Sequence, residues 1–306
     1  PGAFSVGSLN RGNGGTATDG FVALFFLFGQ TPSPQSSWYV GGTKDDGING
    51  IANRPSQTVT TGYTKSDDFP MSTANTPYQS SNSALTLPST GQDGFIASFP
   101  NGSNTPGYSS YLGLTDAECE AITYYSGTQF AIAGTTRAGG LVTKNAFSGA
   151  FQGGGSDAFV GLFNVSNGTA TGAGPGSVTY LSYLGGAGND AAHAIGIVGS
   201  PASSIAVAGD TTTPDTDTAL APAQFYGTFN ATGNKDAFVA QISPGSFSPT
   251  ATLDTFFYLG GAGDDSARGL ARGYYNGLDG YYVVGSTNSP TASFFSDIPT
   301  LSLIHI

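Results

Sequence analysis

The chain has 306 residues, of which 38% are hydrophobic and 12% aromatic, and its formal net charge is −11 with only nine Lys and Arg residues. This length and apolar content allow a packed core, in one large β domain or two ordinary ones, and exclude a disordered tail. The shortage of basic residues argues against nucleic acid and anionic membrane surfaces as partners, because both are bound through a basic face.

The composition and the first apolar run favour strands over helices. Gly occupies 47 positions, and charged residues make up only 9% of the chain, so the Glu, Lys and Arg that favour helices are scarce. The run FVALFFLF at residues 21–28 is too short to span a bilayer and lacks the basic flank and N-terminal position of a leader. We therefore predict a strand there and no membrane insertion. Because the chain starts with Pro1 rather than Met, we expect a leader or further domains to be missing.

Four sequence landmarks recur in the same order along the chain. The first is Asp, then Gly or Ala, then Phe, then Val or Ile, beginning at Asp19, Asp93, Asp157 and Asp236. An aromatic strand ending in a glycine turn follows, then a segment rich in small residues, then a β-rich segment ending in Gly-x-Thr. The glycines after the aromatic strand recur every 72 to 75 residues, at Gly41, Gly113, Gly185 and Gly260. Such runs, bounded by turn residues and without a 3.6-residue apolar period, are typical of strands.

Four strands per repeat are typical of one blade of a β-propeller. We predict an all-β fold with four four-stranded antiparallel blades in a single domain over residues 1–300. The first two and last two strands would share one blade, which would close the ring and remove free sheet edges. A fragment of a larger propeller, or closure between neighbouring molecules, is the alternative. The paired glycines are expected to supply a turn with positive φ.

The succession PGAF, DGFVALF, WYVGG, DDGINGIAN, TVTTGYT and DDFP resembles the SBBP-type β-propeller repeat. The resemblance covers essentially residues 1–300 and implies a secreted or cell-surface protein, without implying any single activity. The second copy departs most, because Leu114 replaces the second glycine and TDAECE replaces the acidic turn. The tail at residues 301–306 fits no landmark and is expected to be a sequence artefact.

Few residues have the chemistry of a catalytic centre. His305 lies in the doubtful tail, and His193 stands where sister repeats have Asn49 and Arg268, which predicts an exposed, variable position. Cys119, the only cysteine, has no evident activating partner and is expected to be a small, semi-buried side chain. One cysteine and one credible histidine argue against tetrahedral zinc. We therefore predict that the protein is not an enzyme.

Carboxylates gather after the glycine turn of each repeat. They are Asp45, Asp46, Asp190, Asp264 and Asp265, with Asp116 and Glu118 near the matching place in the second repeat. Because they recur with the repeat, we expect them to accept backbone N–H groups, as we also expect of the first-landmark aspartates. Calcium is the alternative, here and at residues 214–218, although no D-x-D-x-D-G loop is present. No other cofactor is expected.

Four Asn-x-Ser/Thr sequons fall in predicted loops, at Asn101, Asn164, Asn167 and Asn230. Glycosylation would place the protein outside the cell, whereas chance also produces sequons in a chain rich in Asn, Ser and Thr. The single Cys119 permits no intrachain disulfide, which fits a reducing compartment or an exterior protein stabilised by other means.

Two groups of aromatic residues are candidates for contact surfaces. Tyr39, Tyr111, Tyr183 and Tyr258 recur at one position of the repeat, so we expect them to pack blades rather than bind carbohydrate. The stretch GYYNGLDGYY at residues 273–282 occurs only in the last repeat. It is either a contact hairpin or an ordinary Asn-Gly turn.

Three functional hypotheses follow. The first is a structural protein of the cell exterior, whose copies join each other or other surface-assembly proteins in a fibre, flagellar hair, sheath or layer. The second is an adhesion module that recognises glycan or protein through loops on one propeller face, and the third is an enzyme. The low charge, the sequons and the lack of a catalytic set favour the first hypothesis.

Overall fold

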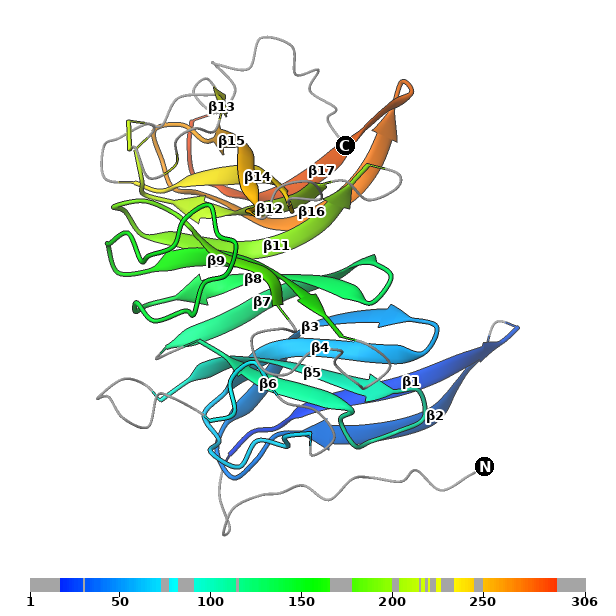
Figure 1. Ribbon diagram of the computed structural model, residues 1–306. Helices are drawn as coiled ribbons and strands as arrows, with labels where there is room; N and C mark the ends of the chain where they lie inside the picture. Colours follow the sequence, from blue (N-terminus) through cyan, green and yellow to red (C-terminus); the bar gives the residue numbers. More distant parts are fainter. Residues whose placement is uncertain are drawn as a thin grey trace. The chain divides into compact units, whose positions relative to one another are not determined.

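The computed structural model describes residues 17–29, 31–72, 77–81, 91–113, 116–165, 178–199, 204–214, 216–217, 220, 224–226, 234–244 and 250–290. These residues form strands and turns without an α-helix (Figure 1), which confirms the predicted all-β fold. The chain divides into two compact units. The first unit comprises residues 1–130 and 163–179, and the second comprises residues 131–162 and 180–306.

The strands up to residue 126 form one hairpin and one larger sheet, together with a strand of a further sheet. They are β1 (Gly20–Phe28), β2 (Thr31–Val40), β3 (Asp46–Arg54), β4 (Gln57–Thr64), β5 (Asp93–Pro100), β6 (Tyr108–Leu112) and β7 (Ala117–Ser126). β1 and β2 pair antiparallel as a two-stranded sheet, which we call the N-terminal hairpin. β3 to β6 form an antiparallel sheet of order β3-β4-β5-β6.

The later strands follow the same plan. They are β8 (Gln129–Thr136), β9 (Asp157–Asn164), β10 (Val178–Leu184), β11 (Asp190–Val198), β12 (Ser204–Thr211), β13 (Gln224–Tyr226), β14 (Asp236–Ser243), β15 (Thr252–Leu259), β16 (Asp265–Tyr275) and β17 (Leu278–Thr287). One sheet has the order β10-β9-β8-β7 and another β11-β12-β14-β15-β13. The short β13, which the sequence pattern did not predict, pairs parallel to β15. β16 and β17 form a two-stranded antiparallel sheet, the C-terminal hairpin.

Each larger sheet combines the last two landmarks of one repeat with the first two of the next. In the sheet β3-β4-β5-β6, the Gly-x-Thr strand β4 pairs antiparallel with β5, which starts the second repeat. β12 pairs with β14 in the same way in the later sheet. This order leaves the first two landmarks in the N-terminal hairpin and the last two in the C-terminal hairpin. The shared four-stranded sheet predicted for these two hairpins is not formed among the described strands.

The strands of the first landmark are the apolar centre of the larger sheets. β5 and β9 are buried from their first residue to their seventh, as expected for strands covered on both faces. Phe95, Phe159 and Phe238, one from each copy, are all at most 1% exposed. Continuous apolar runs therefore correspond to covered strands in β5 and β9, but not in β1, where the similar run FVALF is mostly exposed.

The third-landmark strand carries a β-bulge at one position of the repeat. The pairing passes from Ile48 opposite Gly62 to Gly50 opposite Thr61, which leaves Asn49 as the extra residue. The corresponding extra residues are His193 in β11 and Arg268 in β16. At the bulge the backbones of the two strands lie close together. A Cβ on the glycine of Gly-x-Thr would lie only 1.9 Å from a carbonyl oxygen of the bulged strand. This holds for Gly62, Gly209 and Gly285.

The paired glycines after the aromatic strand correct one prediction. Gly41, Gly185 and Gly260 do not have positive φ, so a left-handed turn is not the reason for them. A Cβ at Gly41 would instead lie 2.5 Å from the Asp19 carboxylate, and Gly185 and Gly260 have aspartate oxygens equally close. Glycine is required there because an aspartate carboxylate packs against its α-carbon. Gly113 is the exception, with a φ of 115°, in the repeat where Ala117 replaces the aspartate.

Candidate functional site

The recurrent carboxylates at the start of the third-landmark strand close the glycine turn. Asp46, Asp190 and Asp265 are at most 2% exposed. Each accepts a hydrogen bond from the backbone N–H four residues earlier and another from a Ser or Thr hydroxyl. The donors are Gly42 N (2.7 Å) and Ser66 Oγ (2.8 Å), Gly186 N (3.0 Å) and Thr213 Oγ1 (2.9 Å), and Gly261 N (2.9 Å) and Ser289 Oγ (2.7 Å). This confirms the predicted structural role of these three residues.

The neighbouring acids bind other groups. Asp45 accepts hydrogen bonds from Thr18 N at 3.1 Å and Lys65 Nζ at 3.2 Å. Asp264 accepts one from Lys235 N at 3.1 Å. Within the part of the chain that the structure describes, no three His, Cys, Asp or Glu side chains gather as a metal site.

Burial raises the pKa of several of these acids, Asp46 among them, and the shift is large for two. Burial, reinforced by the charge of Asp190, raises the pKa of Asp157 to about 7, although Gln152 N donates to its carboxylate at 2.6 Å. Burial likewise raises the pKa of Asp190 to about 6, against the hydrogen bonds from Thr211, Gly186 and Thr213. Both groups are therefore partly protonated near neutral pH.

Bulge residues of two consecutive repeats meet at one carboxylate in the second unit. The His193 Nε2 lies 3.0 Å from Asp210 Oδ2, and the Arg268 Nη2 lies 3.8 Å from the same oxygen. Lys235 Nζ at 3.2 Å and Ser266 Oγ at 2.6 Å complete the cluster. Burial opposes the ionisation of Asp210, but the hydrogen bonds from His193 and Ser266 and the charge of Lys235 outweigh it and hold its pKa at about 2.

This cluster overturns the prediction that His193 is exposed. Its side chain is only 12% exposed, because the bulge turns it toward Asp210 on the neighbouring strand. The cluster contains Ser, His and Asp but lacks the geometry of a catalytic triad. In a triad the histidine binds the serine, whereas here Ser266 and His193 both bind the same oxygen of Asp210. The arrangement is a group of ion pairs and hydrogen bonds that links β11, β12 and β16, which we call the Asp210 cluster.

Cys119 is more buried than predicted. Its side chain is fully enclosed within the first unit, and burial raises the pKa of its thiol to about 12. A thiol in this state is a poor nucleophile, because the thiolate is the reactive form. In the first unit the bulge position holds an uncharged amide in place of His193 or Arg268. Asn49, the bulge residue, donates to Glu118 Oε1 at 2.8 Å and to the Cys119 carbonyl at 3.1 Å.

The structure places two of the four sequons. Asn101 lies in the exposed turn after β5, as predicted. Asn164 is the last residue of β9 and accepts a hydrogen bond from the Thr128 hydroxyl, so the prediction of a loop is wrong there. Asn167 and Asn230 lie outside the described residues.

The aromatic predictions divide between the larger sheets and the two hairpins. Tyr111, Tyr183 and Tyr258 are buried, which confirms their packing role, but Tyr39 in β2 is 36% exposed. Residues 273–282 form the end of the C-terminal hairpin, with the turn at Asn276 and Gly277, which both have positive φ. This confirms the Asn-Gly turn.

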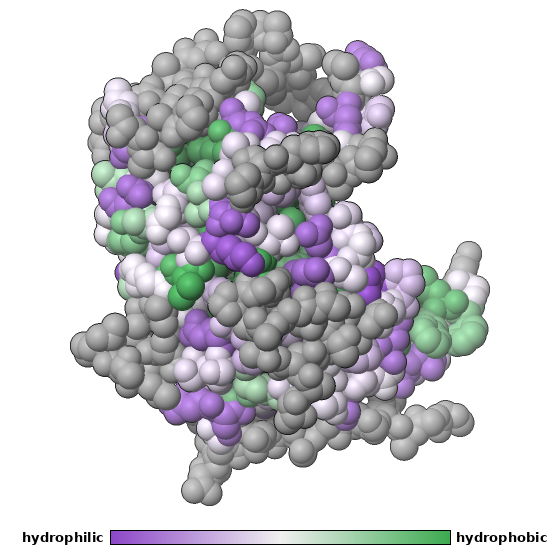
Figure 2. Space-filling model, in the orientation of Figure 1, coloured by the Kyte–Doolittle hydropathy of each residue, from purple (hydrophilic) through white to green (hydrophobic). Residues whose placement is uncertain are grey.

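The N-terminal hairpin exposes a strand whose sequence counterparts are buried. Phe21 in β1 is 69% exposed, whereas its counterparts in β5, β9 and β14 are at most 1% exposed. Further exposed apolar residues follow along the strand: Phe25, Phe26, Leu27 and Phe28. Figure 2 shows hydrophobic residues gathered over the tip of this hairpin. An exposed apolar patch of this kind is a candidate interaction site.

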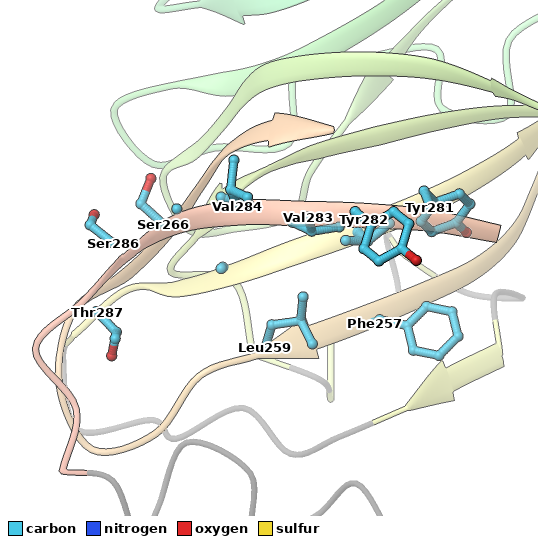
Figure 3. Close-up of a pocket in the computed structure, with 13 residues that line it drawn as sticks. Phe257, Leu259, Ser266, Tyr281, Tyr282, Val283, Val284, Ser286 and Thr287 are labelled. Atoms are coloured by element: carbon cyan, nitrogen blue, oxygen red, sulfur yellow. The ribbon is translucent and has the colours of Figure 1, made fainter. Parts of the chain in front are cut away.

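The C-terminal hairpin is open in a complementary way. Thr287 at the end of β17 is exposed, whereas the matching Thr64, Thr136 and Thr211 are completely buried. Beside β17 is an apolar pocket of about 600 Å³, which we call the β17 pocket. β14 contributes Ala237 and Val239, β15 contributes Phe257 and Leu259, and β17 contributes residues 281–287. In Figure 3, Phe257 and Leu259 lie on β15, across the pocket from the β17 residues.

Comparison with known proteins adds no assignment, because neither a protein-family model nor a curated protein matches the chain. The described part of the chain also contains no helix with the length and hydrophobicity of a membrane span. The sequence did not predict the Asp210 cluster or the β17 pocket. The recurrence of His193 and Arg268 at one position of the repeat could have indicated that these two side chains share a role.

Proposed function

We propose that the sheets are blades of a β-propeller and that the protein is a non-enzymatic structural subunit of an extracellular surface assembly, such as a fibre, hair, sheath or layer. The observation that carries this proposal is the exposure of β1. A strand that repeats the sequence of a buried central strand lies at the open edge of a two-stranded sheet. Such an edge accepts a further strand by main-chain pairing.

The exposed side chains favour assembly energetically. Full burial of one Phe or Leu side chain is worth about 1.5–3 kcal/mol, and β1 presents several of them in succession. Strand addition would also pair the open backbone groups of the edge. Both contributions favour a state in which the N-terminal hairpin is covered.

The contacts of three side chains with potential catalytic chemistry support a structural role. Ser266 and His193 are both engaged by Asp210, and Cys119 is enclosed as a thiol. The exposed sequon at Asn101 and the resemblance to a repeat of secreted proteins support an extracellular location.

Electron microscopy and light scattering of the mature protein test this proposal. We expect regular fibres or lattices, and a mass that rises with protein concentration. Isolated discs of single-chain mass at every concentration would overturn it and favour the adhesion module. A glycan array would then be the next measurement.

A further inference from the structure

We infer that the β17 pocket takes strand β1 of a second copy of this chain, antiparallel to β17, with Gly285 opposite Phe21 and Thr287 opposite Asp19. This inference rests on the proposed function, because it names the partner and the contact through which copies assemble. The completed sheet would have the order β16-β17-β1-β2, with the first pair from one copy and the second pair from the next.

The pairing follows from the two sheets in which the same junction is already formed. In each of them, the strand ending in Gly-x-Thr pairs antiparallel with the strand that starts the next repeat. The observed pairs are Thr64 with Asp93 and Gly62 with Phe95 in one sheet, and Thr211 with Asp236 and Gly209 with Phe238 in the other. Both junctions have the same register. Transferring it to the open edges places Thr287 opposite Asp19.

The faces of the two hairpins agree with this register. In β1, Val22 packs into the core of the first unit, while its neighbour Phe21 is exposed. In β17, Val283 packs on the core of the second unit, while Val284 is 66% exposed. Directly opposed residues of an antiparallel pair share a face of the sheet.

The register therefore joins a covered residue to an uncovered one on each face. It sets Val22 opposite Val284 on one face, and Val283 opposite the exposed Ala23 on the other. Each hairpin has one face packed on its own unit and one exposed face. In the completed sheet, the exposed face of each hairpin would be covered by the unit of the other hairpin. A slip of one residue would reverse every side chain and destroy this match.

The pocket has the shape and chemistry for the strand. In the formed junction, the Phe238 ring lies against Gly209, where an added Cβ would be 2.9 Å from its Cε1. In the proposed junction Phe21 lies opposite Gly285, one of the residues that line the pocket. The surrounding Ala237, Val239 and Leu259 are apolar and match a phenylalanine ring.

We assign the β17 edge to a second copy because every chain presents one open edge of each kind, so one copy can complete the next. Among the described strands, β1 pairs only with β2 and β17 only with β16. The two edges are different surfaces, so the contact is heterologous. A heterologous contact that does not close on itself produces a head-to-tail polymer.

Disulfide trapping tests the partner and the register together. Leu24 and Tyr282 lie opposite one another in the proposed register and are both exposed, so neither substitution opens a core. Two separate proteins, Leu24→Cys and Tyr282→Cys, are mixed under mild oxidation and run on a non-reducing gel. The native Cys119 is fully buried and contributes little background. We expect a mixed dimer in at least tenfold excess over either self-dimer.

The matched control is Phe25→Cys mixed with Tyr282→Cys, which lies one residue out of register and on the other face. Equal or greater trapping in this control would overturn the register. The double variant L24C/Y282C should form a ladder of oligomers. A cross-linked monomer would instead show that the hairpins close within one chain, which overturns the second copy as the occupant.

The outcomes separate this inference from the proposed function. If ordered assemblies are present under the microscope but neither pair cross-links, the inference fails and the proposed function stands. If the wild-type protein stays a single chain at every concentration, the proposed function itself fails.

Discussion

β1 and β5 carry almost the same first landmark, Asp-Gly-Phe-Val from Asp19 and Asp-Gly-Phe-Ile from Asp93, yet their surroundings are opposite. β5 has a paired strand on each side, and Phe95 is completely buried. β1 is paired on one side only, and Phe21 is 69% exposed. The same local sequence therefore makes the same strand, but the neighbouring strand and sheet decide whether that strand is a core or a surface.

The largest expected effect is on stability, at the phenylalanine that the two strands share. Phe95→Ala should lower the free energy of unfolding by about 3–5 kcal/mol, because it leaves a cavity in a closed core. Phe21→Ala should change it by less than about 0.5 kcal/mol in dilute, unassembled protein, since the ring is exposed. Urea denaturation of both variants measures the difference.

The ranking should reverse when assembly is measured. Phe21→Ala should lower the association constant, measured from the rise of mass with concentration, by at least tenfold. This corresponds to a loss of about 1.4 kcal/mol or more of burial free energy. Similar stability losses in both variants would show that β1 is already covered in the isolated chain.

A second prediction compares the glycine beside the bulge in a larger sheet with the same glycine in the C-terminal hairpin. An added methyl at Gly62 in a larger sheet, or at Gly285 in the C-terminal hairpin, would lie 1.9 Å from a backbone carbonyl. We expect Gly62→Ala to lower the free energy of unfolding by about 1–3 kcal/mol, as overpacking does. Gly285→Ala should reduce hydrogen-exchange protection in β16 and β17.

Gly280→Ala is the matched control in the same hairpin, because nothing lies within 4 Å of the added methyl. It should leave both stability and exchange unchanged within about 0.5 kcal/mol. A neutral Gly285→Ala would mean that the bulge tolerates a wider backbone separation than the structure shows.

A smaller effect concerns pH and the carboxylates of the larger sheets. The pKa of Asp157 is raised to about 7 and that of Asp190 to about 6, so the folded state binds protons more tightly than the unfolded state. Their contribution to stability is complete below the unfolded pKa near 4 and is lost as the pH rises through 6 and 7. The melting temperature should fall by roughly a few degrees between pH 5 and pH 8.

Asp157→Asn should flatten this dependence, since the amide has no proton to lose in that range. Asp210 acts in the opposite direction and in a different window. Its pKa is lowered to about 2, so its contribution is lost only as the pH falls below about 4. A melting temperature that rises from pH 5 to pH 8 would contradict the burial-driven shifts.

The smallest expected effect is at the sequon of the β5 turn. Asn101→Gln should remove one glycan from the mature protein, seen as a mass decrease, while changing stability by less than about 0.5 kcal/mol. The Asn101 side chain is exposed, whereas Asn164 is half-buried at the end of a strand. An unchanged mass would leave Asn101 unmodified.

The sequence alone determined the landmark strands and their order along the chain, but not the short β13. Apolar runs bounded by Gly, Asp and Asn define strands through local backbone preferences, and the fourfold recurrence placed them in repeats. The role of the acids after the glycine turn was also predictable, because a carboxylate that recurs with a turn is a hydrogen-bond acceptor for it. These features depend on residues close in the sequence.

The tertiary structure decided what lies against each strand. The reason for Gly41 is a carboxylate from Asp19, and the partner of His193 is Asp210, both brought near by strand pairing rather than by sequence spacing. The local sequence also did not determine which side chains are exposed. Phe21 and Phe95 have the same local sequence, and only the strand that pairs beside each one separates a core residue from an open edge.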